Sequence, residues 1–197
     1  MSGEYLPPAE REPGIDPPRI YVASLSDYNN GILHGNWLDA AQEPNELQAD
    51  ITEMLATSPT QQRYGDVAEE WAIHDHEGFG SLQIGEYTGI ERISRLAKGI
   101  EQHGLAFAAW AAYVGETSDE LLDQFEDRYQ GEWPNVWAYA DNLLDELDAH
   151  RYLDEVPEWL QTYVSIDVAG FARDLELSGD IITEEAESGS VWIWSGH

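Results

Sequence analysis

The sequence predicts an α+β fold built from three small domains. Short segments rich in β-branched and aromatic residues lie near both ends of the chain. Between them, apolar residues recur at intervals of three and four, which is the spacing of amphipathic helices. Turn and break residues divide these segments into groups. We expect an N-terminal α+β domain with a short antiparallel sheet (19–87), a central helical bundle (88–130) and a C-terminal α+β domain with a closing hairpin (131–197).

The N-terminal part begins with a predicted leader and a predicted hairpin. Residues 1–18 contain five of the nine prolines and no hydrophobic period, so we expect them to be flexible. Arg19–Ala23 is a predicted strand. A turn at Asn29–Gly31 then leads to a second strand that ends at Leu38.

A helix and a third strand complete this predicted domain. Pro44 suits a first helical turn, and the following apolar stripe consists of Leu47, Ile51, Met54 and Leu55. We expect residues 57–65 to form a loop. Residues 70–75 should add a strand.

The central segment predicts three helices. Thr88 is the expected N-cap of the first, whose apolar residues are Ile90, Ile93, Leu96, Ala97 and Ile100. Residues 105–114 are nearly all apolar and should form a buried helix. Thr117 and Glu120 fit a capping box that opens a third helix, which runs to about residue 130.

The C-terminal part predicts helices followed by a hairpin. A helix is expected over residues 135–148, and another after Pro157 with Trp159, Leu160, Tyr163 and Val164 as its apolar side. A further helical stretch follows Asp167 and stops near Gly179. Residues 181–183 and 191–194 flank a turn at Ser188-Gly189 and predict the closing hairpin.

The acidic excess limits the possible partners. The chain carries 39 acidic and 9 basic side chains, a net charge of −30, yet it is 42% hydrophobic with eight Trp and can form a core. A folded body with this charge repels nucleic acid and anionic membranes and attracts basic proteins. The absence of cysteine excludes disulfides and thiolate sites. No signal sequence or membrane span is evident, so we expect a soluble, cytoplasmic protein.

The acids are placed unevenly along the predicted helices. In the helix expected over 118–130, an apolar arc that includes Leu121, Leu122 and Phe125 lies opposite an arc of acids. These acids are Asp119, Glu120, Asp123, Glu126 and Asp127. In the next helix Asp141, Asp145 and Asp148 follow at i, i+4 and i+7, apart from an apolar arc that includes Trp137, Ala140, Leu144 and Leu147.

Two accounts of this acidity differ in what they explain. Adaptation to high salt would give many acids and little lysine anywhere on the surface. Helix faces of a single charge sign, however, lower helix stability by about 0.2–0.5 kcal/mol per like-charge pair, so their repetition on successive helices indicates a function. Residues 99–197 contain 22 acids and three bases. Since duplex DNA carries one charge per about 1.7 Å, the 30 net charges match roughly 50 Å of duplex. We therefore favour a protein that imitates the phosphates of DNA.

Several strings resemble the ArdA family of antirestriction proteins. They occur in order along about residues 19–195 and comprise 19–31 and 35–37, then 70–75 and 86–88, and finally 156–163 and 172–180. The last string corresponds to the segment known as the antirestriction motif. Their combination and order are specific to this family.

The resemblance implies an elongated, three-domain homodimer encoded on a mobile genetic element. Such a protein mimics DNA and occupies the DNA-binding groove of the methyltransferase–specificity core of type I restriction–modification enzymes. It would need no cofactor and perform no chemistry. Dimerisation through the C-terminal domain makes Phe171–Gly179 the expected interface, with Tyr163 nearby. Within that block, the interface candidates are Phe171, Leu175, Leu177 and Gly179.

Three other interpretations fit parts of the sequence. His74 and His76 have the spacing of a metal pair on a strand, but no third ligand is evident. Paired carboxylates with many Trp residues could form a glycosidase cleft, although no single pair stands out among 39 acids. An acidic histone-like chaperone or scaffold for basic proteins shares the electrostatics and is the main alternative function.

Overall fold

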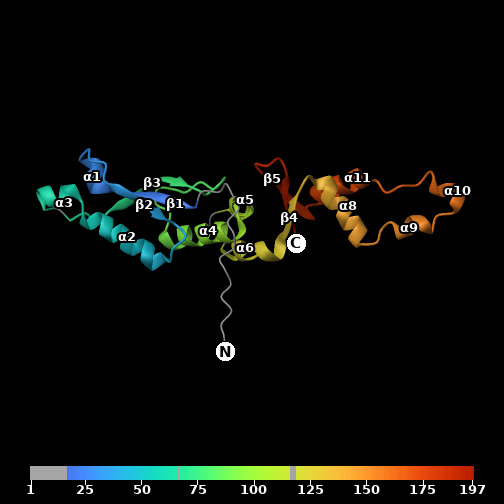
Figure 1. Cartoon of the computed structure of the whole chain (residues 1–197), viewed down its shortest axis with the longest axis horizontal. Coiled ribbons are helices and arrows are strands. Elements are labelled where there is room, and N and C mark those ends of the chain that lie inside the picture. The colour runs from blue at the N-terminus through green and yellow to red at the C-terminus, as the bar shows by residue number, and fades with distance from the viewer. Residues whose placement is uncertain (1–16, 66, 116–118) are drawn as a thin grey trace, which may run out of the picture. The chain divides into compact units, whose positions relative to one another are not determined.

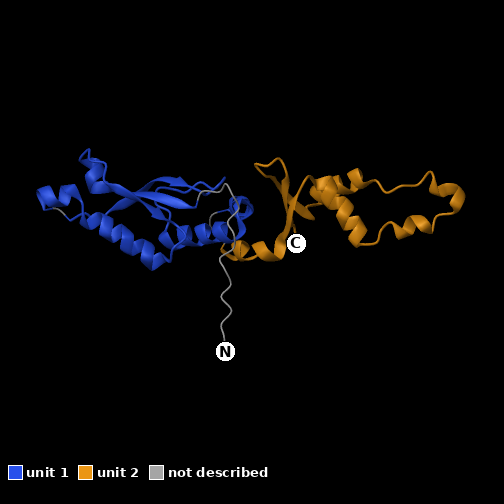
Figure 2. Cartoon of the chain, viewed as in Figure 1, with its two compact units in different colours: residues 1–117 blue, residues 118–197 orange. Residues whose placement is uncertain are grey.

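The computed structural model describes residues 17–65, 67–115 and 119–197. The chain forms two compact units, Met1–Thr117 and Ser118–His197 (Figure 2). The predicted boundary between residues 87 and 88 lies inside the first unit, so the division into three domains stays a prediction. The fold is α+β, as expected, with a small antiparallel sheet in each unit. Within the described residues, no helix is long and apolar enough to cross a membrane.

The sheet of the first unit consists of the three predicted strands. These are β1 (Arg19–Ser24), β2 (Gly35–Asp39) and β3 (Trp71–Glu77), in the order β2-β1-β3 (Figure 1). The antiparallel pairing of β1 with β2 confirms the hairpin. Its connection contains a short helix, α1 (Leu25–Asn29), which was not predicted. Alternate residues of β1, Ile20 and Val22, are fully buried.

Two predicted amphipathic helices contribute to this core. They are α2 (Pro44–Ala56) and α4 (Ile90–His103), and every apolar residue predicted on their stripes is buried. The predicted apolar helix is α5 (Leu105–Val114), with Ala106–Ala111 buried. The helix α4 begins after Gly89 rather than after Thr88. The hydroxyl of Thr88 instead accepts a hydrogen bond from the Gly85 amide at 3.0 Å.

The segment expected to be a loop at residues 57–65 contains a helix, α3 (Pro59–Tyr64). Ser58 caps it by accepting from the Gln61 amide at 3.2 Å, and Pro59 occupies its first position. Gly65 ends it at φ 78°, where a side chain would be strained. A serine–proline start and a glycine stop were therefore present in the sequence.

The second unit departs from the predicted helix over 118–130. The structure has two short helices, α6 (Asp119–Asp123) and α7 (Phe125–Arg128), which Gln124 separates. The chain then forms a strand, β4 (Tyr129–Trp133), so the predicted boundary between residues 130 and 131 falls inside that strand. Gly131 has a φ of 100° at the irregularity where β4 pairs with β6. The predicted capping residue Thr117 lies outside the described residues.

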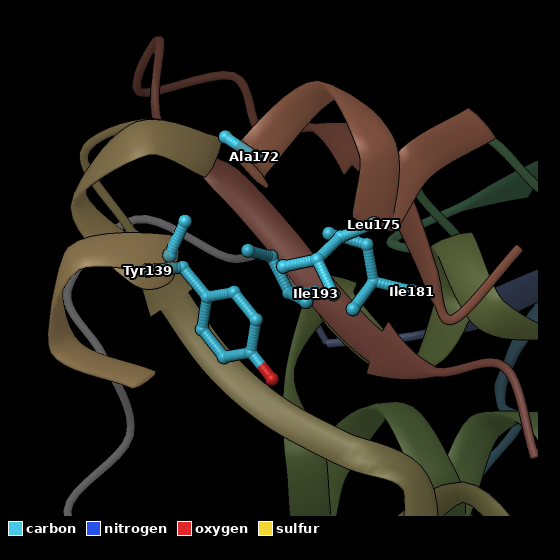
Figure 3. Close-up of a cluster of buried hydrophobic side chains, with 6 residues drawn as sticks. Tyr139, Ala172, Leu175, Ile181 and Ile193 are labelled. Atoms are coloured by element: carbon cyan, nitrogen blue, oxygen red, sulfur yellow. The ribbon is translucent and has the colours of Figure 1, made fainter. Parts of the chain in front are cut away.

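The predicted C-terminal hairpin is confirmed, and its sheet contains one strand more than predicted. It consists of β5 (Ile181–Glu185) and β6 (Val191–Ser195), and β4 joins it in the order β4-β6-β5. This sheet packs on α8 (Val136–Glu146) and α11 (Val168–Ser178). Asp167 caps α11, and Gly179 ends it as predicted. Figure 3 shows the core, where Tyr139, Leu175 and Ile193 converge from α8, α11 and β6.

The chain between α8 and α11 contains two one-turn helices, α9 (Arg151–Asp154) and α10 (Glu158–Gln161). Neither helix has a buried residue, and Figure 1 shows this segment extending away from the α8–α11 pair. A helix does follow Pro157, as predicted, but α10 ends at Gln161 and does not include Tyr163 and Val164. Its expected apolar side is largely in solvent, since Trp159 is 73% and Tyr163 81% exposed. Four residues are too few for a stable apolar face within one protomer.

Candidate acidic binding surface

The five acids predicted on one arc are all exposed in the structure. Asp119, Glu120 and Asp123 lie on α6, and Glu126 and Asp127 lie on α7. The apolar residues Leu122 and Phe125 are buried. The alternation of inward apolar and outward acidic residues is therefore as predicted, although a kink at Gln124 interrupts the helix.

The basic residue of this segment lies against the protein body. Arg128 is half-buried and donates from Nη1 to the Ser195 carbonyl at 3.1 Å. It also donates from Nε to Oε1 of Gln124 at 2.9 Å. The bond to Ser195 ties α7, which carries Glu126 and Asp127, to the end of β6.

The second predicted acidic stripe is less regular than expected. The helix α8 ends at Glu146, and Asp148 has a φ of 52°, so Asp148 does not continue the helical stripe. Two of the three acids also face basic groups. Oδ1 of Asp145 lies 3.2 Å from Nε2 of His150, and Oδ2 of Asp148 lies 3.7 Å from Nη1 of Arg151. Asp141 is half-buried and has no basic partner within the described part of the chain.

The apolar arc predicted on α8 is only partly buried. Ala140 and Leu144 lie in the core, whereas Trp137 is 50% and Leu147 61% exposed. Trp133, on β4, packs edge-on against the Tyr139 ring with 5.4 Å between centroids. Trp137 therefore does not take the core position that the sequence predicted for it.

A further fixed carboxylate was not singled out from the sequence. Glu132 on β4 accepts hydrogen bonds from the hydroxyls of Ser188 and Ser190, in the turn between β5 and β6. These bonds hold the pKa of Glu132 below its usual value, in spite of partial burial. Residues 56 and 58 positions away supply the donors, so helical or strand periodicity could not reveal this cluster.

The predicted dimer residues fall into two groups. Leu175 is buried in the core of its own unit, and Phe171 packs partly against the same cluster. Gly179 has a φ of 77° and ends α11. Tyr163 and Leu177, in contrast, are 81% and 79% exposed and are accessible to a partner.

The two histidines considered as metal ligands contact aromatic rings. His74 meets the ring of Tyr28 edge-on at 4.8 Å, and His76 meets that of Phe79 at 5.8 Å between centroids. In the parts of the chain that the structure describes, no three His, Asp or Glu residues are grouped in a way that could hold a metal ion.

Fold and surface together define an acidic α+β protein whose most prominent chemical feature is a set of exposed carboxylates on short helices. The family model for the antirestriction protein ArdA matches residues 20–188. The chain therefore belongs to the ArdA family of antirestriction proteins, which inhibit restriction and are not a known family of enzymes. A comparison with curated proteins gave no match.

Proposed function

We propose that this protein is a DNA mimic that occupies the DNA-binding groove of type I restriction–modification enzymes and inhibits both restriction and modification. The partner would be the methyltransferase–specificity core, whose groove must bind a polyanion. The observation that carries the proposal is the exposed row of acids on α6 and α7 in a member of the antirestriction family. Inhibition by occupancy requires no cofactor and no bond-making step.

Charge supports this mechanism over recognition of a small ligand. The chain carries a net −30, and residues 99–197 contribute 22 acids against three bases. A cleft lined with Lys and Arg is attracted to carboxylates and to phosphates by the same Coulomb interaction. Association should therefore be fast at low salt and weaken as salt increases.

We further propose that the protein acts as a homodimer formed through the second unit. Tyr163, which precedes α11 in the sequence, and Leu177, in the last turn of α11, have exposed apolar side chains. The segment of α9 and α10 adds Tyr152 and Trp159, which are 56% and 73% exposed. Isolated apolar residues on a surface are ordinary, but several in one segment without buried neighbours indicate an interface.

Phage plating tests the proposed function directly. A host with an active type I system should restrict unmodified phage less when this protein is expressed. The same host without the protein should restrict the phage fully. The same host without the restriction system controls for effects on phage growth. Unchanged restriction by a soluble, folded sample would contradict the proposal.

Binding measurements separate the mimic from an acidic chaperone or scaffold. A mimic should compete with duplex DNA for the purified methyltransferase–specificity core, with affinity that falls steeply between ~50 and ~500 mM salt. A general chaperone should bind free histone-like basic proteins equally well. Preference for those proteins over the core would favour the alternative function.

A further inference from the structure

The helix α8 exposes an indole beside a carboxylate on one face. Trp137 lies in the first turn, Asp141 four residues later and Asp145 after another four, so the three follow one another along the helix surface. Trp137 is 50% exposed, and Asp141 is half-buried. Tyr139, Ala140 and Leu144 are buried in the core of the unit, so Trp137 and Asp141 lie beside this buried face.

The exposure of Trp137 is selective within its helix. Its apolar neighbours Val136 and Leu143 pack against the core cluster, and Asn135 caps the helix by accepting from the Ala138 amide at 2.9 Å. The helix start is therefore fixed, and Trp137 is held at a defined position in solvent. A large rigid ring in this setting is typical of an interface anchor.

Charge then limits what this ring can contact. Asp145 and Asp148 face His150 and Arg151, but Asp141 has no basic partner in the described part of the chain. A negative group would be repelled by Asp141 and by the net charge of −30. A guanidinium group satisfies both neighbours, because it stacks on an indole and donates paired hydrogen bonds to a carboxylate.

We propose that Trp137 and Asp141 form a binding site for an arginine side chain of the target's DNA-binding groove. This inference rests on the proposed function and adds a contact that DNA phosphates do not offer. The indole contributes an interaction that salt screens little, whereas the carboxylates contribute the salt-dependent part. The protein can thereby compete with DNA at salt concentrations where charge alone is weak.

Affinity for the methyltransferase–specificity core, measured at several salt concentrations, tests the site. Trp137→Ala should weaken binding about tenfold at every salt concentration, and Trp137→Phe should retain most of the affinity. Asp141→Asn should weaken binding mainly at low salt. The double variant should lose less than the product of the two single losses, because one arginine uses both groups. Tyr64→Ala, which removes a 60% exposed ring from the other unit, is the control and should bind like the wild type.

Two results would overturn the proposal while leaving the proposed function intact. One is wild-type binding by Trp137→Ala at all salt concentrations. The other is a change from dimer to monomer in that variant by light scattering, which would place the indole between two copies of the chain. Failure of the wild type to bind the core would instead contradict the proposed function.

A peptide titration tests the arginine site even if the wild type does not inhibit the enzyme. In the NMR spectrum, the indole N–H resonance of Trp137 is assigned by its loss in Trp137→Phe. An arginine-rich peptide should shift this resonance more than a lysine-rich peptide of equal charge, and the difference should disappear in Asp141→Asn. Equal shifts with both peptides would contradict the site.

Discussion

At the scale of single residues, Asp27 is the clearest structural carboxylate of the first unit. It is fully buried, and its Oδ1 accepts a hydrogen bond from the Thr60 amide at 2.8 Å, which joins α1 to the start of α3. We predict that Asp27→Ala lowers the free energy of unfolding by about 1–3 kcal/mol, because a buried N–H loses its acceptor. Urea unfolding measures this change. Asp75→Ala, at an exposed position, is the control and should change stability by less than about 0.5 kcal/mol.

The same carboxylate predicts a pH dependence with a definite sign. Burial raises the pKa of Asp27, but the Ser58, Thr60 and Ser24 hydroxyls and the Thr60 amide outweigh it and hold the pKa well below its usual value. A carboxyl with a lowered folded pKa stabilises the fold above its unfolded pKa of about 3.9, and this stabilisation is lost as pH falls below it. The difference in unfolding free energy between wild type and Asp27→Asn should therefore narrow from pH ~6 to pH ~3. A constant difference would contradict this assignment.

At the scale of elements, long and strongly periodic segments were predictable. The spacing of apolar residues identified α2 and α4, a nearly unbroken apolar run identified α5, and β-branched and aromatic segments between turn signals identified β1, β3 and the β5–β6 hairpin. The burial of α2 and α4 follows from the same pattern, because each has an apolar face that must pack against another element. Two of the elements that the sequence missed, α1 and α3, are short, and the contact between Asp27 and Thr60 joins them.

Some features of the candidate site could likewise be predicted from the sequence, and others could not. Exposure of the acids on α6 and α7 could be predicted, since helical spacing separates them from Leu122 and Phe125. The kink at Gln124 could not, because residues 129–133 leave the helical pattern to pair with β6, more than 55 residues away. The exposed position of Trp137 also depends on which distant side chains fill the core.

The contact between α4 and α5 gives a prediction for these elements. A Cβ added at Gly99 would lie 2.2 Å from the Phe107 ring, which is closer than any side-chain contact allows. Gly99→Ala should destabilise the first unit by about 1–3 kcal/mol, although alanine normally favours a helix. Thermal unfolding followed by circular dichroism measures it. Gly89→Ala, whose Cβ would meet nothing closer than 3.9 Å, is the matched control, and equal effects of both would contradict the packing argument.

At the scale of the whole molecule, net charge acts oppositely on stability and on binding. A folded chain with −30 charges repels itself, and salt screens this repulsion over about 10 Å at 0.1 M. We predict that raising NaCl from ~50 to ~500 mM increases the melting temperature by a few degrees while it weakens inhibition. Calorimetry and binding on the same sample measure both. A melting temperature that falls with salt would show that self-repulsion does not limit stability.

The placement of charge, as distinct from its amount, can be tested by neutralising two equal sets of exposed acids. One variant replaces the acids of α6 and α7, namely Asp119, Glu120, Asp123, Glu126 and Asp127, by their amides. The other replaces five exposed acids of the first unit, namely Glu53, Glu69, Glu70, Glu86 and Glu91. Each variant loses five of the negative charges that contribute to the net −30.

If α6 and α7 contact the groove, the first variant should bind the methyltransferase–specificity core about tenfold more weakly at ~100 mM salt, with a shallower salt dependence. The second variant should bind nearly as well as the wild type, because screening limits the reach of exposed charges that make no contact. Affinity across a salt series, with circular dichroism to confirm folding, measures both. Equal losses in the two variants would mean that only total charge matters, which is what general acidity from salt adaptation predicts.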